Sequence, residues 1–295
     1  MTCHNRRDRT LAALTSLKAQ SGLPAGTALT VHLVDAGSSD GTAAAVRRDF
    51  PETDVVTVGS DVYWGTGTRI AAERADPTSH VLLLNDDVLL TSEALAVLLR
   101  TAAPLERPAI AIGAMRSSDS ARTTYSGYHV VRAGFGPPRL VRAEPDPWHP
   151  TICDTCNGNA VLVTNAARRV LGDVDTAFPH RMGDMDYGLR ARKAGIPVLL
   201  CPGHLGTCDD HSMRAPGSSG EAGITALRSL RRMTSVRELP PGPWWEFCRR
   251  HFGAWAPLHF CSPYARTLSS RVVRSALPRE KHGVTRPSSA HQADT

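Results

Sequence analysis

Short apolar runs alternate with helix-like segments through the first half of the chain, and this alternation limits the fold more than any other feature. Leu11, Leu14 and Leu17 recur at helical spacing, and the segments that follow in order are VHLVD, TAAAVRRDF, DVVTV, RIAAERA and HVLLLNDD. Such alternation is typical of a mostly parallel sheet flanked by helices. The sequence therefore predicts an α/β fold.

The polar residues that follow the apolar runs are the candidate site residues. In open α/β sheets, ligands bind beyond the carboxyl ends of the strands. The corresponding positions here are residues 3–5, 35–40, 60–68 and 85–87. We expect the binding site to be built from these segments.

The alternation weakens after about residue 105 and then returns. Residues 105–150 read as strands and loops, whereas NGNAVLVTNAARRVLG predicts a strand that leads into a helix. The run GDMDYGLRARKAG predicts a second helix, with Asp184 in its first turn and Gly195 after its basic last turn. Residues 196–200 predict a further strand.

Three parts are expected along the chain. Residues 1–211 form the main domain, residues 212–280 form a basic, tryptophan-rich helical appendage, and the polar residues 281–295 are predicted to be disordered. Residues 212–295 hold 13 of the 34 Lys and Arg residues but only 5 of the 28 Asp and Glu residues. This basic segment suggests contact with an acidic surface, and no nucleic-acid motif accompanies it.

Composition narrows the class of protein. With 295 residues and 41% apolar content, the chain can fill a core. Its apolar runs are too short for a membrane span, and MTCHNRRD has no signal-peptide core. The seven scattered cysteines suggest reduced thiols. We therefore expect a cytoplasmic protein.

The clearest chemical motif is LLLNDDV at residues 82–88. It places Asn85, Asp86 and Asp87 directly after a buried strand, where carboxylates are costly unless a charge meets them. Mg²⁺ or Mn²⁺ is the natural partner, because hard cations take oxygen ligands and bridge phosphates. The alternative is a cap for the helix that follows.

Two further motifs carry carboxylates. VDAGSSDGT ends a strand at Asp35, which could accept hydrogen bonds from a base or ribose, although a turn capped before a helix is also ordinary structure. Asp184 lies about a hundred residues after LLLNDDV and could act as a general base toward a hydroxyl. Asp186 should point elsewhere and is expected to be structural. The alternative for Asp184 is a plain charge at a helix start.

Taken together and in this order, TCHNRRDRTLAAL, VDAGSSDGT, LLLNDDV and GDMDYGLRARKAG resemble the family 2 glycosyltransferases over about residues 2–211. The resemblance implies a Rossmann-like GT-A fold. It also implies an inverting, metal-dependent transferase that moves a sugar from a nucleoside-diphosphate sugar, with UDP- or dTDP-sugars favoured, to a saccharide or lipid-linked acceptor. Rhamnosyl- and galactofuranosyl-transferase-like members, which build cell-surface polysaccharide, look most similar.

The resemblance also assigns roles to residues. Thr2, His4, Asn5 and Asp35 match the nucleotide-contacting positions. Asn85 and Asp86 match the donor diphosphate motif, and Asp87 matches its metal ligand. Asp184 matches the catalytic base. Trp64 lies where the family has a loop over the donor, and His211 is the preferred further metal ligand among His204, Asp209, Asp210 and His211. Gly183 stands where the family usually has a first acid.

Four other interpretations remain open at this stage. WGTGTRI at residues 64–70 resembles the phosphate loop of sugar nucleotidyltransferases, although it comes late in the chain. Cys153, Cys156, Cys201 and Cys208 could bind a structural zinc, although the second pair is spaced too widely. The glycine at 183 allows a non-catalytic, nucleotide-sugar-binding scaffold of the same fold. A hydrolase is less favoured, because no G-x-S-x-G nucleophile elbow is present.

The two ends of the chain lead to separate hypotheses. Basic and tryptophan residues in the appendage suit peripheral attachment at the inner face of an anionic membrane, or simply packing of Trp244, Trp245 and Trp255 onto the main domain. In the resembled family a full buried strand precedes the first loop, but here TCHN follows Met1 directly. We hypothesise that Met1 is internal and that several apolar residues precede it.

Overall fold

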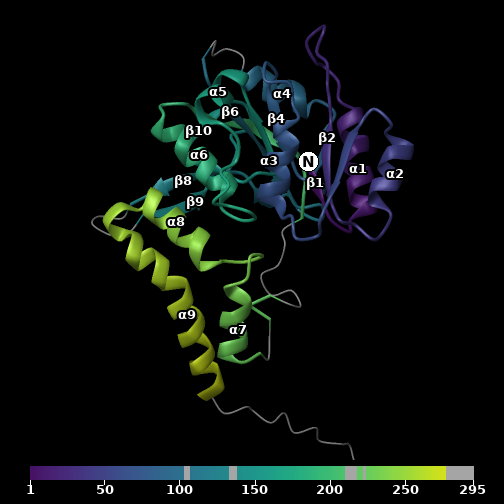
Figure 1. Cartoon of the computed structure of the whole chain (residues 1–295). Coiled ribbons are helices and arrows are strands. Elements are labelled where there is room, and N and C mark those ends of the chain that lie inside the picture. The colour runs from purple at the N-terminus through teal and green to yellow at the C-terminus, as the bar shows by residue number, and fades with distance from the viewer. Residues whose placement is uncertain (103–106, 133–137, 210–217, 222–223, 277–295) are drawn as a thin grey trace, which may run out of the picture.

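A computed structural model describes residues 1–102, 107–132, 138–209, 218–221 and 224–276. Its main body is an α/β arrangement in which helices cover a twisted sheet system (Figure 1). The first half alternates strands and helices as the sequence predicts. Its elements are β1 (Thr2–Cys3), α1 (Arg7–Lys18), β2 (His32–Ala36), α2 (Thr42–Asp49), β3 (Asp54–Val58), α3 (Trp64–Glu73), β4 (Val81–Leu84), β5 (Leu89–Leu90) and α4 (Ala94–Ala102).

The second half of the main body is richer in strands. Residues 107–156 form strands and loops, as expected from their looser pattern. A strand and two helices then appear where the sequence places them. The elements are β6 (Ile110–Arg116), β7 (Thr123–Tyr125), β8 (Gly127–Val131), β9 (Arg139–Arg142), β10 (Thr151–Cys153), β11 (Thr155–Cys156), β12 (Ala160–Val163), α5 (Asn165–Leu171), α6 (Gly183–Lys193) and β13 (Val198–Thr207).

Three sheets make up the body. β1, β2 and β3 form a parallel sheet in which β2 is central. A larger sheet has the order β10-β13-β6-β12-β4, with β6 and β13 parallel and β12 antiparallel to both of its neighbours. A small antiparallel sheet has the order β11-β8-β9. The predicted α/β class is confirmed, and the antiparallel β12 is a detail that its apolar run did not reveal.

The core explains why the buried strands read as continuous apolar runs. β12 is buried over all four residues, and β6 over all but its last. Leu33 and Val34 of β2 are fully buried, and Leu33 packs in one cluster with Val46 of α2. Strands covered on both faces need apolar side chains on both faces. Polar residues follow directly after such strands, and these polar residues form the candidate site described below.

The C-terminal elements extend from one side of the body (Figure 1). They are α7 (Ala226–Met233), α8 (Pro241–His251), a 3₁₀ turn (Gly253–Trp255) and α9 (Ala256–Ala276). α8 packs against the body through Phe247, whereas α9 runs away beside α7. Within the described residues, no helix combines the length and the apolar character that crossing a membrane requires. The predicted disordered segment, residues 281–295, lies outside the described residues.

Candidate active site

The loops after β1 and β2 are hydrogen-bonded to each other. The imidazole of His4 donates from Nδ1 to the carbonyl oxygen of Ala36 at 2.7 Å, and Ser39 N donates to Asn5 Oδ1 at 2.7 Å. Asn5 has a φ of 50°, a left-handed conformation that asparagine tolerates better than most residues. Because β1 and β2 are parallel neighbours, their carboxyl ends meet at this edge. The sequence-predicted residues His4 and Asn5 therefore lie together beside the second loop.

Asp35 and Thr2 lie deeper than these loop residues. Asp35 is 1% exposed, and its Oδ1 accepts hydrogen bonds from the backbone and hydroxyl of Ser38. Thr2 is buried in β1, where its side chain lies against Gly67 of α3 and its hydroxyl has no hydrogen-bond partner. Asp35 thus supports the loop, and Thr2 packs beneath it.

An acidic pair follows β4, and one guanidinium contacts both of its members. Nη1 of Arg6 donates to Asp86 Oδ1 at 3.2 Å and to Asp87 Oδ2 at 2.9 Å. Burial raises the pKa of Asp86 to about 6; the charge of Arg6 opposes this rise and that of Asp87 adds to it. The other oxygen of Asp86, Oδ2, is buried without a hydrogen-bond partner. The buried Oδ2 of Asp86 therefore lacks a partner like the one that Oδ1 has in Arg6.

The acidic pair fits the divalent cation that its sequence suggests. An orphaned, buried carboxylate oxygen beside a second carboxylate is the hard oxygen donor set that Mg²⁺ and Mn²⁺ prefer, and such ions are commonly held by one or two carboxylates plus substrate phosphates. Asp86 and Asp87 would hold the ion. The third predicted ligand, His211, lies outside the described residues. His204 and Asp209 bond instead to Thr123 and Ser118, respectively.

Trp64 connects the end of β4 with the start of α6. Its indole Nε1–H donates to Asn85 Oδ1 at 2.7 Å. Its ring also lies directly over Gly158, because a Cβ built on Gly158 would come within 2.5 Å of the Trp64 ring and 3.2 Å of Asp184 Cβ. A side chain at position 158 would therefore disturb both neighbours. Segments that are widely separated in the sequence converge here on one small region.

Asp184 lies in the first turn of α6 and accepts two backbone hydrogen bonds. Gly158 N donates to Oδ2 and Met185 N donates to Oδ1, each at 2.8 Å. Burial raises the pKa of Asp184, and these amide bonds only partly oppose the rise. A raised pKa brings a carboxyl closer to the range in which it exchanges protons near neutral pH.

Gly183, where the resembled family usually has an acid, is required by packing. A Cβ at this position would lie 2.8 Å from Val174 Cγ1 and 3.4 Å from Phe178 Cβ. Real Cβ atoms almost never come within 3.0 Å of a neighbour, so an acid at this position would require Val174 to shift. The glycine therefore suits the packing of this loop against Val174 and Phe178.

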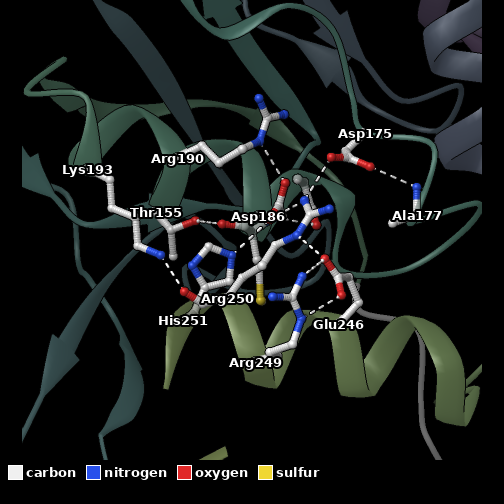
Figure 2. A network of polar contacts seen from close by, with 12 residues as sticks. Thr155, Asp175, Ala177, Asp186, Arg190, Lys193, Glu246, Arg249, Arg250 and His251 are labelled. Atoms are coloured by element: carbon white, nitrogen blue, oxygen red, sulfur yellow. Dashed lines mark hydrogen bonds and ion pairs between the residues drawn. The ribbon is translucent and has the colours of Figure 1, made fainter. Parts of the chain in front are cut away.

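Asp186 is fully buried in a polar network (Figure 2). It accepts from Arg190 Nε and His251 Nε2, each at 2.8 Å, and from Arg250 Nη1 at 3.3 Å. Burial alone would raise the pKa of Asp186, but the hydrogen bonds from His251 and Arg190 outweigh burial and lower it. The expected structural role of Asp186 fits these contacts.

The sequence motifs alone do not place three residues of this region in the site. Arg6 lies within HNRRDR and Gly158 within NGN, and neither motif indicates a function for them. Cys208 was considered only as a zinc ligand, yet its thiol lies 3.5 Å from Asp87 Oδ1. Of the three, only Arg6 could have been predicted from the sequence, because it is a basic residue next to a loop of the predicted site and can pair with carboxylates there. The other two depend on tertiary contacts.

Two alternative interpretations do not match the structure. WGTGTRI begins helix α3, where Thr66 N bonds to Pro179 O and Gly67 N to Tyr63 O, so these amides do not form a phosphate loop. The four cysteines divide between two core clusters, Cys153 and Cys156 in one and Cys201 and Cys208 in the other. Within the described ranges, no three His, Cys, Asp or Glu side chains are grouped to hold a metal.

Solved structures with a similar fold include nucleotide-sugar transferases. The mannosyltransferase PcManGT from Pyrobaculum calidifontis, in complex with GDP-Man and Mn²⁺, has a TM-score of 0.51 and 14% identity, covering 93% of this chain and 73% of that chain. GalNAc-T7 with UDP, GalNAc and Mn²⁺ has a TM-score of 0.54 and 13% identity, covering 94% of this chain and 57% of that chain. At such identities the likeness shows the fold alone, which is that of GT-A glycosyltransferases.

Sequence comparison identifies the family. No curated protein matches the chain significantly. Residues 1–171, more than half of the 295 residues, match the family described as "Glycosyl transferase family 2". With the GT-A fold and the convergent acidic residues already in place, this match settles the classification. The chain belongs to glycosyl transferase family 2.

Proposed function

We propose that this protein transfers a sugar, with inversion, from a nucleoside-diphosphate sugar to an acceptor hydroxyl, using Asp184 as the general base. The observation that carries the proposal is the contact chain from Asp184 through Gly158 and Trp64 to Asn85. It joins a carboxyl of raised pKa to the acidic pair after β4. A base on one side and a phosphate-binding region on the other is the arrangement that single displacement requires.

The reaction needs one proton acceptor from the protein, and the two substrates supply the nucleophile and the leaving group. The ionised carboxylate of Asp184 takes the proton of the acceptor hydroxyl as the acceptor oxygen bonds to the anomeric carbon. The bond from that carbon to the diphosphate breaks, and the nucleoside diphosphate leaves with the electron pair. Attack from the face opposite the leaving group inverts the anomeric centre.

The residues after β4 bind and orient the leaving group. A divalent ion held by Asp86 and Asp87 would neutralise charge on the departing diphosphate. Arg6 is the nearby cation that contacts both carboxylates, and it keeps their mutual repulsion low before the donor binds. His4 and Asn5, fixed against the loop after β2, and Asp35 beneath it, would meet the nucleoside. Trp64 would cover the sugar end of the donor.

Finer features of the proposal concern the substrates and location. We favour a UDP- or dTDP-sugar donor and a saccharide or lipid-linked acceptor in cell-surface polysaccharide synthesis, on the resemblance described above. The C-terminal helices support peripheral contact with an anionic membrane, because Leu227 and Leu258 are 76% and 51% exposed and α7 also carries Arg228, Arg231 and Arg232. Trp244, in contrast, stacks on Phe247 and is partly buried against the core cluster around it. Cosedimentation with anionic and neutral vesicles tests this contact, and equal binding to both would contradict it.

Calorimetry tests the donor-binding half of the proposal. UDP, GDP and dTDP are titrated into the protein with and without Mn²⁺, and the same titrations are repeated on Asp87→Asn. We expect one nucleotide to bind in a metal-dependent way and the variant to lose at least about 100-fold in affinity, since it removes one of two carboxylate ligands. Asp8→Asn is the matched control, because Asp8 is an exposed carboxylate on α1.

The two outcomes separate the candidate functions. Metal-dependent binding of one nucleotide supports the transferase and identifies the donor class, which is then used in acceptor screens. NMR of the glycoside product reports the anomeric configuration, and retention would contradict the single displacement. Absence of binding to every nucleotide would favour a non-catalytic role.

A further inference from the structure

The C-terminal helix α8 is joined to the helix that carries Asp184 by a buried ionic network (Figure 2). Asp186 is 0% exposed, and two of its three side-chain partners, Arg250 and His251, come from the end of α8. The third, Arg190, is one turn along α6. A buried carboxylate with partners from two helices fixes the position of one helix relative to the other.

Arg250 extends the network to the loop that precedes α6. Its Nη1 donates to Asp175 Oδ2 at 2.7 Å as well as to Asp186, and its guanidinium lies over the ring of Phe178 at 5.2 Å. At the other end of α6, the ammonium of Lys193 donates to the carbonyl oxygen of Arg250. α8 therefore holds both ends of α6 and the loop before it.

Apolar packing also contributes to the contact between α8 and the start of α6. Phe247 of α8 is 2% exposed and meets the ring of Phe178 edge-on, with 6.2 Å between centroids. Met182, the residue before α6, lies in the same cluster with a left-handed φ of 72°. A non-glycine residue keeps such a backbone conformation only where its surroundings hold it. The start of α6 is thus set by packing against α8.

The position of Asp184 depends on this contact between α6 and α8. It shares the first turn of α6 with Asp186, and the Met185 carbonyl between them accepts a hydrogen bond from Thr155 Oγ1 at 2.7 Å. Its own bonds go to the backbone amides of Gly158 and Met185 and to the side chain of Asn157, and none of these joins α6 to another helix. A rotation of this turn would move the Asp184 carboxylate away from Trp64 and the acidic pair.

We propose that His251 and Arg250 are positioning residues: by holding Asp186 they place Asp184 for proton abstraction, so α8 is a working part of the active site. The proposal rests on the role of Asp184 proposed above. It assigns a function to a segment beyond residues 1–171, the part that matches the family.

Paired substitutions at His251 test the proposal. His251→Phe keeps a ring against Phe247, 4.8 Å away, but removes the donor to Asp186, whereas His251→Gln keeps a donor. We expect the Phe variant to lose about ten- to a hundredfold in kcat, because small misplacements of a catalytic group are costly. The affinity for the nucleotide should stay unchanged, and the Gln variant should recover most of the turnover. Arg249→Gln is the control, because Arg249 is exposed and bonds to Glu246.

Hydrogen exchange of residues 183–187 provides a readout that does not depend on activity. We expect faster exchange in the Phe variant than in the Gln and Arg249 variants. Wild-type turnover retained in the Phe variant, or loss of kcat without altered exchange at α6, would overturn the positioning role. An inactive wild-type protein with altered exchange in the variant would instead defeat the proposed function while leaving the mechanical link in place.

Discussion

The two sides of the first turn of α6 use the same residue type for opposite purposes. Asp184 lies beside Gly158, accepts hydrogen bonds from two backbone amides, and has a raised pKa. Asp186 faces α8, accepts hydrogen bonds from Arg190, Arg250 and His251, and has a lowered pKa. Both carboxyls are buried, so the difference comes from their partners. A carboxyl without nearby positive charge has a raised pKa, which suits proton transfer. A carboxyl paired with basic side chains stays ionised, which suits a structural contact between two helices.

The strongest way to break this comparison is Asp184→Asn. The variant keeps the size of the side chain and loses the base, so kcat should fall by about 10²- to 10⁴-fold. Nucleotide affinity, measured by calorimetry with Mn²⁺, should change less than threefold or so, because the acidic pair remains intact. Turnover within tenfold of the wild type would show that another group accepts the proton.

Asp186→Asn should act first on stability. It leaves Arg190, Arg250 and His251 around a neutral group, and breaking a buried ionic network from one side costs about 3 kcal/mol or more. Because the pKa of Asp186 is lower when folded than unfolded, its contribution is present above about pH 4 and is lost as the pH falls through the folded pKa. Denaturant unfolding at pH 7 and at pH 3.5 should therefore differ less in the variant than in the wild type. Equal pH dependence in the two proteins would contradict this assignment.

Gly158→Ala tests how strongly the position of Asp184 depends on its neighbours in the candidate site. The added Cβ would meet the Trp64 ring and Asp184 Cβ, so both must shift. We expect kcat to fall about tenfold and the nucleotide to bind more weakly, with the protein still folded. Gly242→Ala is the control, since no atom lies within 4 Å of a Cβ there. A kcat unaffected by the Gly158 change would mean that Trp64 and Asp184 work independently.

Trp64→Phe should give the smallest effect. It retains an aromatic ring over Gly158 but removes the 2.7 Å hydrogen bond to Asn85. One neutral hydrogen bond contributes about 1 kcal/mol, so KM for the donor should rise about fivefold with little change in kcat. Steady-state kinetics with the donor varied gives both constants, and a larger loss in kcat than in KM would place Trp64 in the transition state.

Local patterns in the sequence determined the elements of this protein and the order of its motifs. Apolar runs such as VLLL at residues 81–84 can only be buried strands, and residues after them must lie at a sheet edge. The α/β class and the positions of Asn85, Asp86, Asp87 and Asp184 followed from that rule and from the family resemblance. The direction of β12 did not follow, because an apolar run does not show whether its strand is parallel or antiparallel to its neighbours.

Only the tertiary structure decided how these motifs work together. Arg6 meets Asp86 and Asp87 across eighty residues, and Gly158 separates Trp64 from Asp184, contacts that no local pattern encodes. Asp184 and Asp186 look alike in GDMDYG, yet their opposite pKa shifts depend on which neighbours the helix turns toward them. Electrostatic environment is a property of packed, distant segments, so sequence could name the carboxylates but not assign the charge around each one.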